Sequence, residues 1–140
     1  MYNDRASVMT RITALYVDKI ANRIFEDMGL SLAQYKILEY IFSSPNANVT
    51  TAELEAHFQM SHSTSVGLLN NLEKDGWITR QKTASSGRSK VIGITQKTEN
   101  QRENIQSCGQ KLEQEFTANL TDGETEQYIL LSKKILGITD

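Results

Sequence analysis

Apolar side chains recur at steps of three and four residues along most of the chain, which is the period of a helix with one buried face. The first such stripe lies between residues 7 and 28, and Gly29 follows at a position where helices commonly end. Its members are Val8, Ile12, Leu15, Tyr16, Ile20 and Ile24. The pattern predicts one long amphipathic helix.

Three hydroxyl residues, each followed three positions later by Gln or Glu, predict the starts of further helices. The pairs are Ser31 with Gln34, Thr50 with Glu53, and Thr121 with Glu124. In such a capping box each side chain of the pair accepts a hydrogen bond from the other residue's backbone N–H. We expect a helix that stops before Pro45, a short helix of about eight residues after Thr50, and a last helix through Leu136.

The stretch SHSTSVGLLNNLEKDGW, residues 61–77, predicts a helix that is capped by Ser61 and ends near Lys74. Three leucines give this helix its apolar face: Leu68, Leu69 and Leu72. The tight link Gln59–Met60 separates it from the preceding short helix. Two short helices joined in this way form a helix-turn-helix.

Two β-prone runs, WITRQK at 77–82 and KVIGIT at 90–95, flank the polar loop TASSGRS. This arrangement predicts a hairpin with a long tip. Helical periodicity returns after Thr95 and continues to about Leu120. The apolar face of that helix holds Ile105, Cys108, Leu112 and Phe116.

These elements predict a mainly α fold, in which residues 31–95 form a winged helix-turn-helix with a two-stranded β-wing. No linker in the 140 residues separates independent domains. The apolar fraction is 39%, and the stripes of the outer helices have no obvious place inside so small a core. We therefore expect the regions 1–30 and 96–140 to form a helical dimerisation region.

Composition narrows the cellular setting. A single cysteine, Cys108, excludes an internal disulfide framework and suits a reducing compartment. The N-terminal stretch carries acidic residues and lacks the apolar core of a signal peptide, and no window approaches the roughly 18 apolar residues of a membrane span. We expect a soluble, cytoplasmic protein in which Cys108 is a small buried hydrophobe and Gly109 permits close helix packing.

Charge is distributed unevenly along the chain. The net charge is −2, but residues 76–97 contain five basic residues and no acidic one. The rest of the chain carries ten basic against seventeen acidic residues. A locally basic segment on an acidic body is the electrostatic pattern of a nucleic-acid contact, and a solvated hairpin is the alternative.

Three segments in order, LAQYKILEYI, TAELEAHFQMSHSTSVGLLNNLEKDGWITR and SGRSKVIGITQKTENQ, resemble the MarR family of bacterial transcriptional regulators. They span Leu32 to about Asn100, half of the chain. The resemblance implies a homodimeric winged helix-turn-helix whose terminal regions pair. It further implies a repressor that binds a pseudo-palindromic operator and is relieved by a small aromatic or lipophilic effector.

The sequence departs from the family pattern at three positions. Where the family commonly has a wing aspartate two residues before an arginine, this chain has Ser86 before Arg88. Gly67 and Asn71 stand where the family's recognition helix commonly has an arginine and another basic residue. The last two changes remove positive charge from the surface that would face DNA, and so bear on how tightly this chain binds it.

The helix face opposite the leucines would enter a major groove, and the basic wing would lie against the DNA backbone. The expected DNA-binding residues are Ser61, His62, Ser63, Thr64, Val66, Gly67, Asn70, Asn71, Arg80, Lys82, Arg88 and Lys90. Asn70 suits an adenine and Val66 a thymine methyl group. Arg88 suits the minor groove, and Lys82 and Lys90 suit phosphates.

Two further surfaces are expected. The dimer interface would include Val8, Ile12, Leu15, Leu131 and Ile135. An effector pocket between the dimer helices and the winged region would include Tyr16 and Tyr35, with Tyr40 and Phe42 as further candidates. Ordinary core or interface packing is the alternative for these aromatic residues.

Other classes of protein fit less well. A winged-helix protein-interaction module without tight DNA binding suits the missing arginines at Gly67 and Asn71, and a stand-alone small-molecule binder would need only the aromatic residues. The sequence has no glycine-rich phosphate loop and no nucleophile motif, so we expect neither an enzyme nor a cofactor. A zinc site that uses His57, His62 and Glu53 or Glu55 is a further alternative.

Overall fold

The computed structural model describes residues 4–82 and 90–138, which form six α-helices and a small antiparallel sheet. The elements in order are α1 (Ala6–Phe25), the 3-10 turn η2 (Glu26–Met28), α2 (Leu32–Phe42), the 3-10 turn η3 (Pro45–Ala47), β1 (Asn48–Thr50), α3 (Thr51–Phe58), α4 (His62–Lys74), β2 (Ile78–Lys82), β3 (Lys90–Ile94), α5 (Gln96–Phe116) and α6 (Asp122–Leu136). Gly29 follows η2 with a φ of 69°, as expected of a residue that ends a helix.

The helix starts lie where the capping motifs predict them. All three capping boxes are formed, with both hydrogen bonds present in each. Helix α4 is capped by Ser61, whose hydroxyl accepts a hydrogen bond from the Thr64 backbone N–H at 3.2 Å. The helix-turn-helix formed by α3 and α4 is therefore confirmed.

Strands β2 and β3 pair antiparallel and confirm the predicted two-stranded wing, and a third strand that was not predicted, β1, extends the sheet to the order β1-β3-β2. Strand β1 pairs antiparallel with β3, and Val49 lies opposite Ile92. Three residues are too few to show an alternating pattern, and β1 is defined by its pairing with a strand far along the chain.

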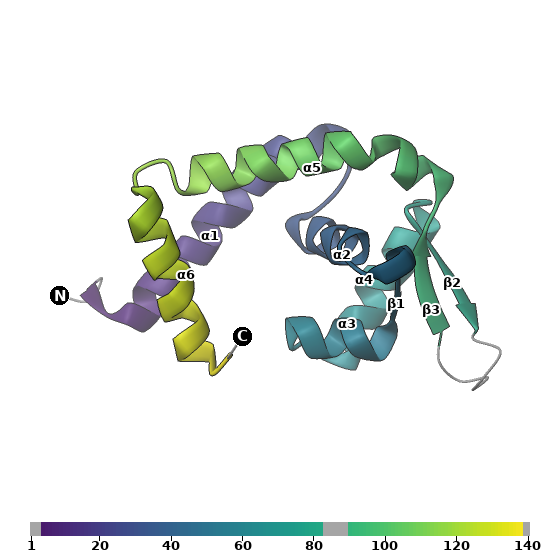
Figure 1. Ribbon diagram of the computed structural model, residues 1–140, viewed down its shortest axis with the longest axis horizontal. Coiled ribbons are helices and arrows are strands. Elements are labelled where there is room, and N and C mark those ends of the chain that lie inside the picture. Colours follow the sequence, from purple (N-terminus) through teal and green to yellow (C-terminus); the bar gives the residue numbers. More distant parts are fainter. Residues whose placement is uncertain (1–3, 83–89, 139–140) are drawn as a thin grey trace.

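Figure 1 shows two ends of the molecule that α5 joins: α1 and α6 at one end, and the helix-turn-helix with its sheet at the other. The core of the winged end is made of fully buried aliphatic side chains from its helices and strands. They include Ile37, Leu38, Ile41, Leu54, Leu69, Leu72, Ile78 and Ile92. Among the described residues, no helix has both the length and the apolar content needed to span a bilayer.

Hydrogen bonds to main-chain carbonyls tie the start of α5 to the segment that follows α4. The Thr98 hydroxyl donates to the Trp77 carbonyl oxygen at 2.5 Å, and the Thr95 hydroxyl donates to that of Gly76 at 2.6 Å. The Lys97 ammonium donates to the Asp75 carbonyl oxygen and lies 4.0 Å from the centre of the Trp77 ring. A shift of α5 would therefore carry the end of α4 with it.

A close approach between α5 and α2 confirms the expected packing function of Gly109. A β-carbon at Gly109 would lie 1.9 Å from the Tyr35 hydroxyl oxygen. Tyr35 is itself held against Phe25, with 4.5 Å between the two ring centres. Cys108 is buried beside this contact, as predicted for a small hydrophobe.

Two glycines inside helices give a matched test of this packing. A β-carbon added at Gly67 would meet no atom of another element within 4 Å, so Gly67→Ala should raise the free energy of unfolding by up to about 1 kcal/mol through helix propensity. Gly109→Ala should instead lower it by about 1–3 kcal/mol, because the new methyl group overlaps Tyr35. Urea unfolding of both variants measures the difference, and equal stabilisation by the two substitutions would contradict this packing.

Candidate nucleic-acid interface

The buried side of α4 leaves a polar face exposed. Leu69 and Leu72 are buried, while Leu68 is only half-buried. Most of the predicted contact residues on and before this helix are exposed to solvent: Ser61, His62, Ser63, Thr64, Gly67, Asn70 and Asn71. Val66 is half-buried, so less of its side chain is available than predicted.

Ser65 differs from the other hydroxyl residues of this stretch in a way that the sequence does not reveal. Its side chain is fully buried, and its hydroxyl donates a hydrogen bond to the Glu55 carboxylate of α3. The same carboxylate oxygen lies 2.9 Å from Nδ1 of His62. These bonds fix the first turn of α4 against α3.

The hydrogen bond from Ser65, and after it the one from His62, lowers the pKa of Glu55 below its ordinary value. Glu55 is therefore ionised at neutral pH. It lies on α3, beside the first turn of α4, which is the end of α4 that would meet DNA. The lowered pKa of Glu55 adds to the free energy of unfolding. This contribution is fully present above the ordinary carboxyl pKa of about 4.3 and is lost as the pH falls through the folded-state pKa of Glu55.

Arg80 of β2 does not extend from the surface as a free wing contact. Its side chain is 16% exposed, and one of its terminal nitrogens donates to Asn70 Oδ1 at 2.6 Å and to Glu73 Oε1 at 2.8 Å. The side-chain oxygen of Asn70 is thus occupied by a hydrogen bond within the protein. Arg80 connects the wing to the recognition helix.

The remaining wing residues lie at or beyond the end of the described segment. Lys82 and Lys90 are paired across β2 and β3, which puts them where the hairpin leaves the sheet. Their side chains, and the whole of Arg88 and Ser86, lie outside the described residues. Their expected contacts with phosphates and the minor groove stay predictions.

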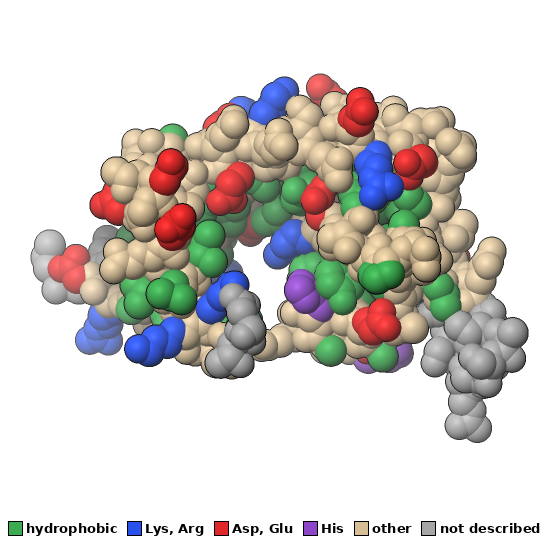
Figure 2. Space-filling model, viewed as in Figure 1, with side chains coloured by type: hydrophobic (Ala, Val, Ile, Leu, Met, Phe, Trp, Pro, Cys, Tyr) green, Lys and Arg blue, Asp and Glu red, His purple; other side chains and the backbone are tan. Residues whose placement is uncertain are grey.

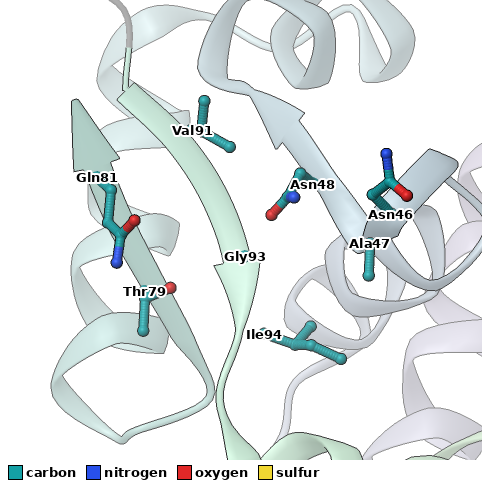
Figure 3. A pocket seen from close by; sticks show the side chains of 8 residues that line it. All are labelled: Asn46, Ala47, Asn48, Thr79, Gln81, Val91, Gly93 and Ile94. Carbon is teal, nitrogen blue, oxygen red and sulfur yellow. The ribbon is translucent and has the colours of Figure 1, made fainter. Parts of the chain in front are cut away.

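The outer face of the sheet carries a polar hollow of about 240 Å³ (Figure 3). Gly93 of β3 lies between its cross-strand partners Asn48 and Thr79, and a β-carbon there would lie 3.0 Å from Asn48 Oδ1. Gln81 lines the same hollow. Its lining side chains are uncharged, so it does not add to the basic surface of the hairpin.

An open groove of about 450 Å³ lies between α2 and α3. Tyr35 and Tyr40 line it, and His57 stacks on the Tyr40 ring with 4.3 Å between the ring centres. Tyr16 is not among the residues that line this groove, and its nearest aromatic ring is Phe116 of α5, at 6.2 Å. Tyr16 and Tyr35, which were expected in one pocket, therefore do not line the same groove.

Two titratable groups of this groove are shifted by their surroundings. Burial, with the carboxylates of Glu39 and Glu113 nearby, raises the pKa of Tyr35 to about 12. Burial also raises the pKa of Glu39, although the Arg102 guanidinium acts in the opposite direction. The groove therefore combines aromatic faces with a carboxyl group that is costly to ionise.

Exposed apolar side chains gather on α1 and α6, and Figure 2 shows them at the end of the molecule opposite the sheet. A groove of about 360 Å³ between the two helices is lined by Met9, Tyr128, Leu131, Ile135 and Leu136, among others. Ile12 and Leu15, also predicted as interface residues, are exposed, and Val8 is half-buried. A patch of this composition is typical of a protein–protein interface.

The two histidines have different partners. His57 stacks on Tyr40, whereas His62 bonds to Glu55. Within residues 4–82 and 90–138, no three histidine, cysteine or acidic side chains are grouped so that they could hold a metal ion. The alternative of a zinc site built from both histidines therefore has no support in this part of the chain.

Comparison with known proteins gives a consistent result. A family model described as the MarR family matches residues 28–89. The multiple antibiotic resistance protein MarR of Escherichia coli is 28% identical over 120 residues, which cover 85% of this chain and 82% of that protein. The uncharacterized HTH-type transcriptional regulator YwoH of Bacillus subtilis is 25% identical over 124 residues, or 89% of this chain and 88% of that protein.

A solved structure supports the same comparison over nearly the whole fold. The chain is similar to the protein in the crystal structure of the S. aureus MepR-DNA complex, with a TM-score of 0.85 and 25% identity. The similarity covers 95% of this chain and 97% of that one. The terminal helices are thus part of the shared architecture, together with the winged segment.

Arg80→Met tests the link between β2 and α4. The substitution keeps much of the length of the side chain but removes the hydrogen bonds that Arg80 donates to Glu73 and Asn70, so the free energy of unfolding should fall by about 1–2 kcal/mol. Gln81→Met, at an exposed neighbouring position on the same strand, is the matched control and should change it by less than about 0.5 kcal/mol. Equal effects in thermal unfolding would show that the Arg80 hydrogen bonds contribute nothing.

Proposed function

We propose that this chain is a member of the MarR family and a sequence-specific DNA-binding transcriptional regulator. The observation that carries the proposal is the exposed polar face of α4, which stands next to a hairpin whose sequence is basic. A capped helix with small polar side chains fits a major groove, where backbone and side chains both reach base edges. MepR of S. aureus, a similar fold, was solved with DNA.

The recognition helix supplies hydrogen-bonding groups and little charge. No Lys or Arg occurs between residues 61 and 73. Ser63, Thr64 and Asn71 are exposed and can donate and accept hydrogen bonds at base edges. Most of the sequence-independent attraction to phosphates must then come from the hairpin, through Lys82, Arg88 and Lys90.

The functional unit is a homodimer in this proposal. Regions 1–30 and 96–140 form the dimerisation region, and residues 31–95 form the DNA-binding region. The support is the exposed apolar surface of α1 and α6, which a second copy of the chain would cover. Two recognition helices would then meet successive major grooves of a pseudo-palindromic operator.

The regulator acts in the cytoplasm as a repressor that a small effector relieves. An aromatic or lipophilic effector would bind in the groove that Tyr35, Tyr40 and His57 line, and Tyr16 would belong to the dimer surface. Such a ligand changes DNA affinity only if it binds one separation of the two winged regions better than another. A winged-helix protein-interaction module is the second candidate function, because residues 61–73 of α4 and its cap contain no Lys or Arg.

Salt dependence of binding to a random-sequence duplex tests DNA binding. Each phosphate contact contributes about 0.9 to the slope of log K against log salt, so Lys82→Ala should reduce the slope by about 0.9 per chain. Lys111→Ala, at an exposed position on α5 away from the wing, is the control and should leave the slope unchanged.

A chain that does not bind duplex DNA at low salt would favour the protein-interaction module. An equal loss of slope in Lys82→Ala and Lys111→Ala would mean that the whole surface charge attracts DNA without a defined contact by the wing.

Sedimentation of the purified chain at micromolar concentration tests the dimer. We expect a dimer for the natural chain and a monomer for Leu131→Glu, because a buried unpaired charge in the α1–α6 groove opposes association. Leu120→Glu, at an exposed leucine outside that groove, should stay dimeric. A natural chain that sediments as a monomer would contradict the proposed unit.

A further inference from the structure

We propose that His62 contacts a DNA phosphate as an imidazolium paired with Glu55, so that each chain takes up a proton when it binds DNA. This inference rests on the proposed function, since it names a regulation of the same surface. It goes further in making DNA affinity depend on pH through one identified pair of residues.

The geometry of the pair directs one ring nitrogen outward. Nδ1 of His62 lies 2.9 Å from Glu55 Oε2, while the side chain as a whole is 77% exposed. Because an ionised carboxylate can only accept hydrogen bonds, Nδ1 must carry the proton. Nε2 is left as the atom that a ligand can reach.

The protonation of Nε2 then decides what His62 can bind. In the neutral ring Nε2 presents a lone pair, which a phosphate oxygen repels because it too is an acceptor. In the imidazolium Nε2–H donates, and the ring carries a positive charge. A phosphate beside His62 therefore favours uptake of a proton.

Glu55 strengthens this coupling. Its carboxylate is fixed by the buried Ser65 hydroxyl and cannot easily turn away from the ring. With a neutral His62 the pair has a charge of about −1 and opposes the approach of DNA, whereas with a protonated His62 its charge is about zero. One proton thus removes a repulsion and supplies a donor.

The neighbouring ionisable groups Glu53, His57 and Glu73 have partners of their own. On α4 the next ionisable side chain is Glu73, in the last turns of the helix, where it faces Arg80 of β2. On α3, His57 points into the groove with Tyr40, and Glu53 is engaged in the capping box of Thr50. Glu55 is therefore the charged partner of His62 among the described residues.

The chain has two histidines, so the contribution of each to the pH dependence of DNA binding can be tested with one substitution. The experiment measures the affinity of the full-length chain for a random-sequence duplex at low salt between about pH 6 and pH 8. For the natural chain we expect affinity to rise as the pH falls, by up to about tenfold per pH unit for each bound chain. His62→Gln should abolish most of this change, and His57→Gln, the matched control, should keep it.

Two further measurements separate the phosphate contact from a purely structural effect. Glu55→Gln should bind more tightly than the natural chain at about pH 8, because the repelling charge is gone, and should respond less to pH. Calorimetric titration of the duplex in buffers of different ionisation enthalpy should show uptake of up to about one proton per chain, absent in His62→Gln.

The outcomes distinguish this inference from the function on which it rests. Binding that is independent of pH, that weakens as the pH falls, or that keeps its pH dependence in His62→Gln would overturn the inference and leave a DNA-binding regulator. A natural chain that binds no duplex at any of these pH values would overturn the proposed function, and the inference with it.

Discussion

The burial of one side of α4 is the constraint on which the rest of the arrangement depends. Leu69 and Leu72 are removed from water in the core of the winged end, and helical geometry then fixes which residues point the other way. Burying two leucine side chains stabilises the fold by about 3–6 kcal/mol, far more than the small polar residues opposite could offset. The burial of these two leucines therefore determines which side of α4 is exposed and available to bind.

Contacts at both ends of α4 turn this exposed face into a rigid surface. At the start of the helix, Glu55 holds Ser65 and His62, and in its last turns Glu73 and Asn70 hold Arg80. Bonds from the start of α5 then fix the segment after α4. The long helix α5 therefore connects the recognition helix to the apolar end of the molecule, where a second chain would set the distance between two such helices.

The parts of this picture that sequence could predict are those encoded within a few residues. A hydroxyl residue followed three positions later by Glu or Gln marks a helix start, and the leucines of α4 mark its buried side, so the helix-turn-helix was predicted. The hairpin was predicted from two β-prone runs that flank a polar loop. Strand β1 was missed because its three residues become a strand only through pairing with β3. Nothing local distinguishes such a segment from a turn.

The site was less predictable than the fold because its contacts join residues distant in sequence. Arg80 looked like a basic wing residue, yet Asn70 and Glu73, on another element, bind its guanidinium. Ser65 looked like one more exposed hydroxyl, and only its burial against Glu55 reveals a different position. Composition indicates which groups are available, whereas tertiary packing decides which of them remain free to bind.

The central claim is that the exposed face of α4 and the adjoining hairpin form the surface that binds DNA. Titration of the isotopically labelled chain with a short duplex, followed residue by residue in its amide NMR spectrum, tests this most directly. We predict that the largest shift changes fall on residues 61–71 and on β2 and β3. Changes centred on the α2–α3 groove or on the α1–α6 surface, with α4 unaffected, would contradict it.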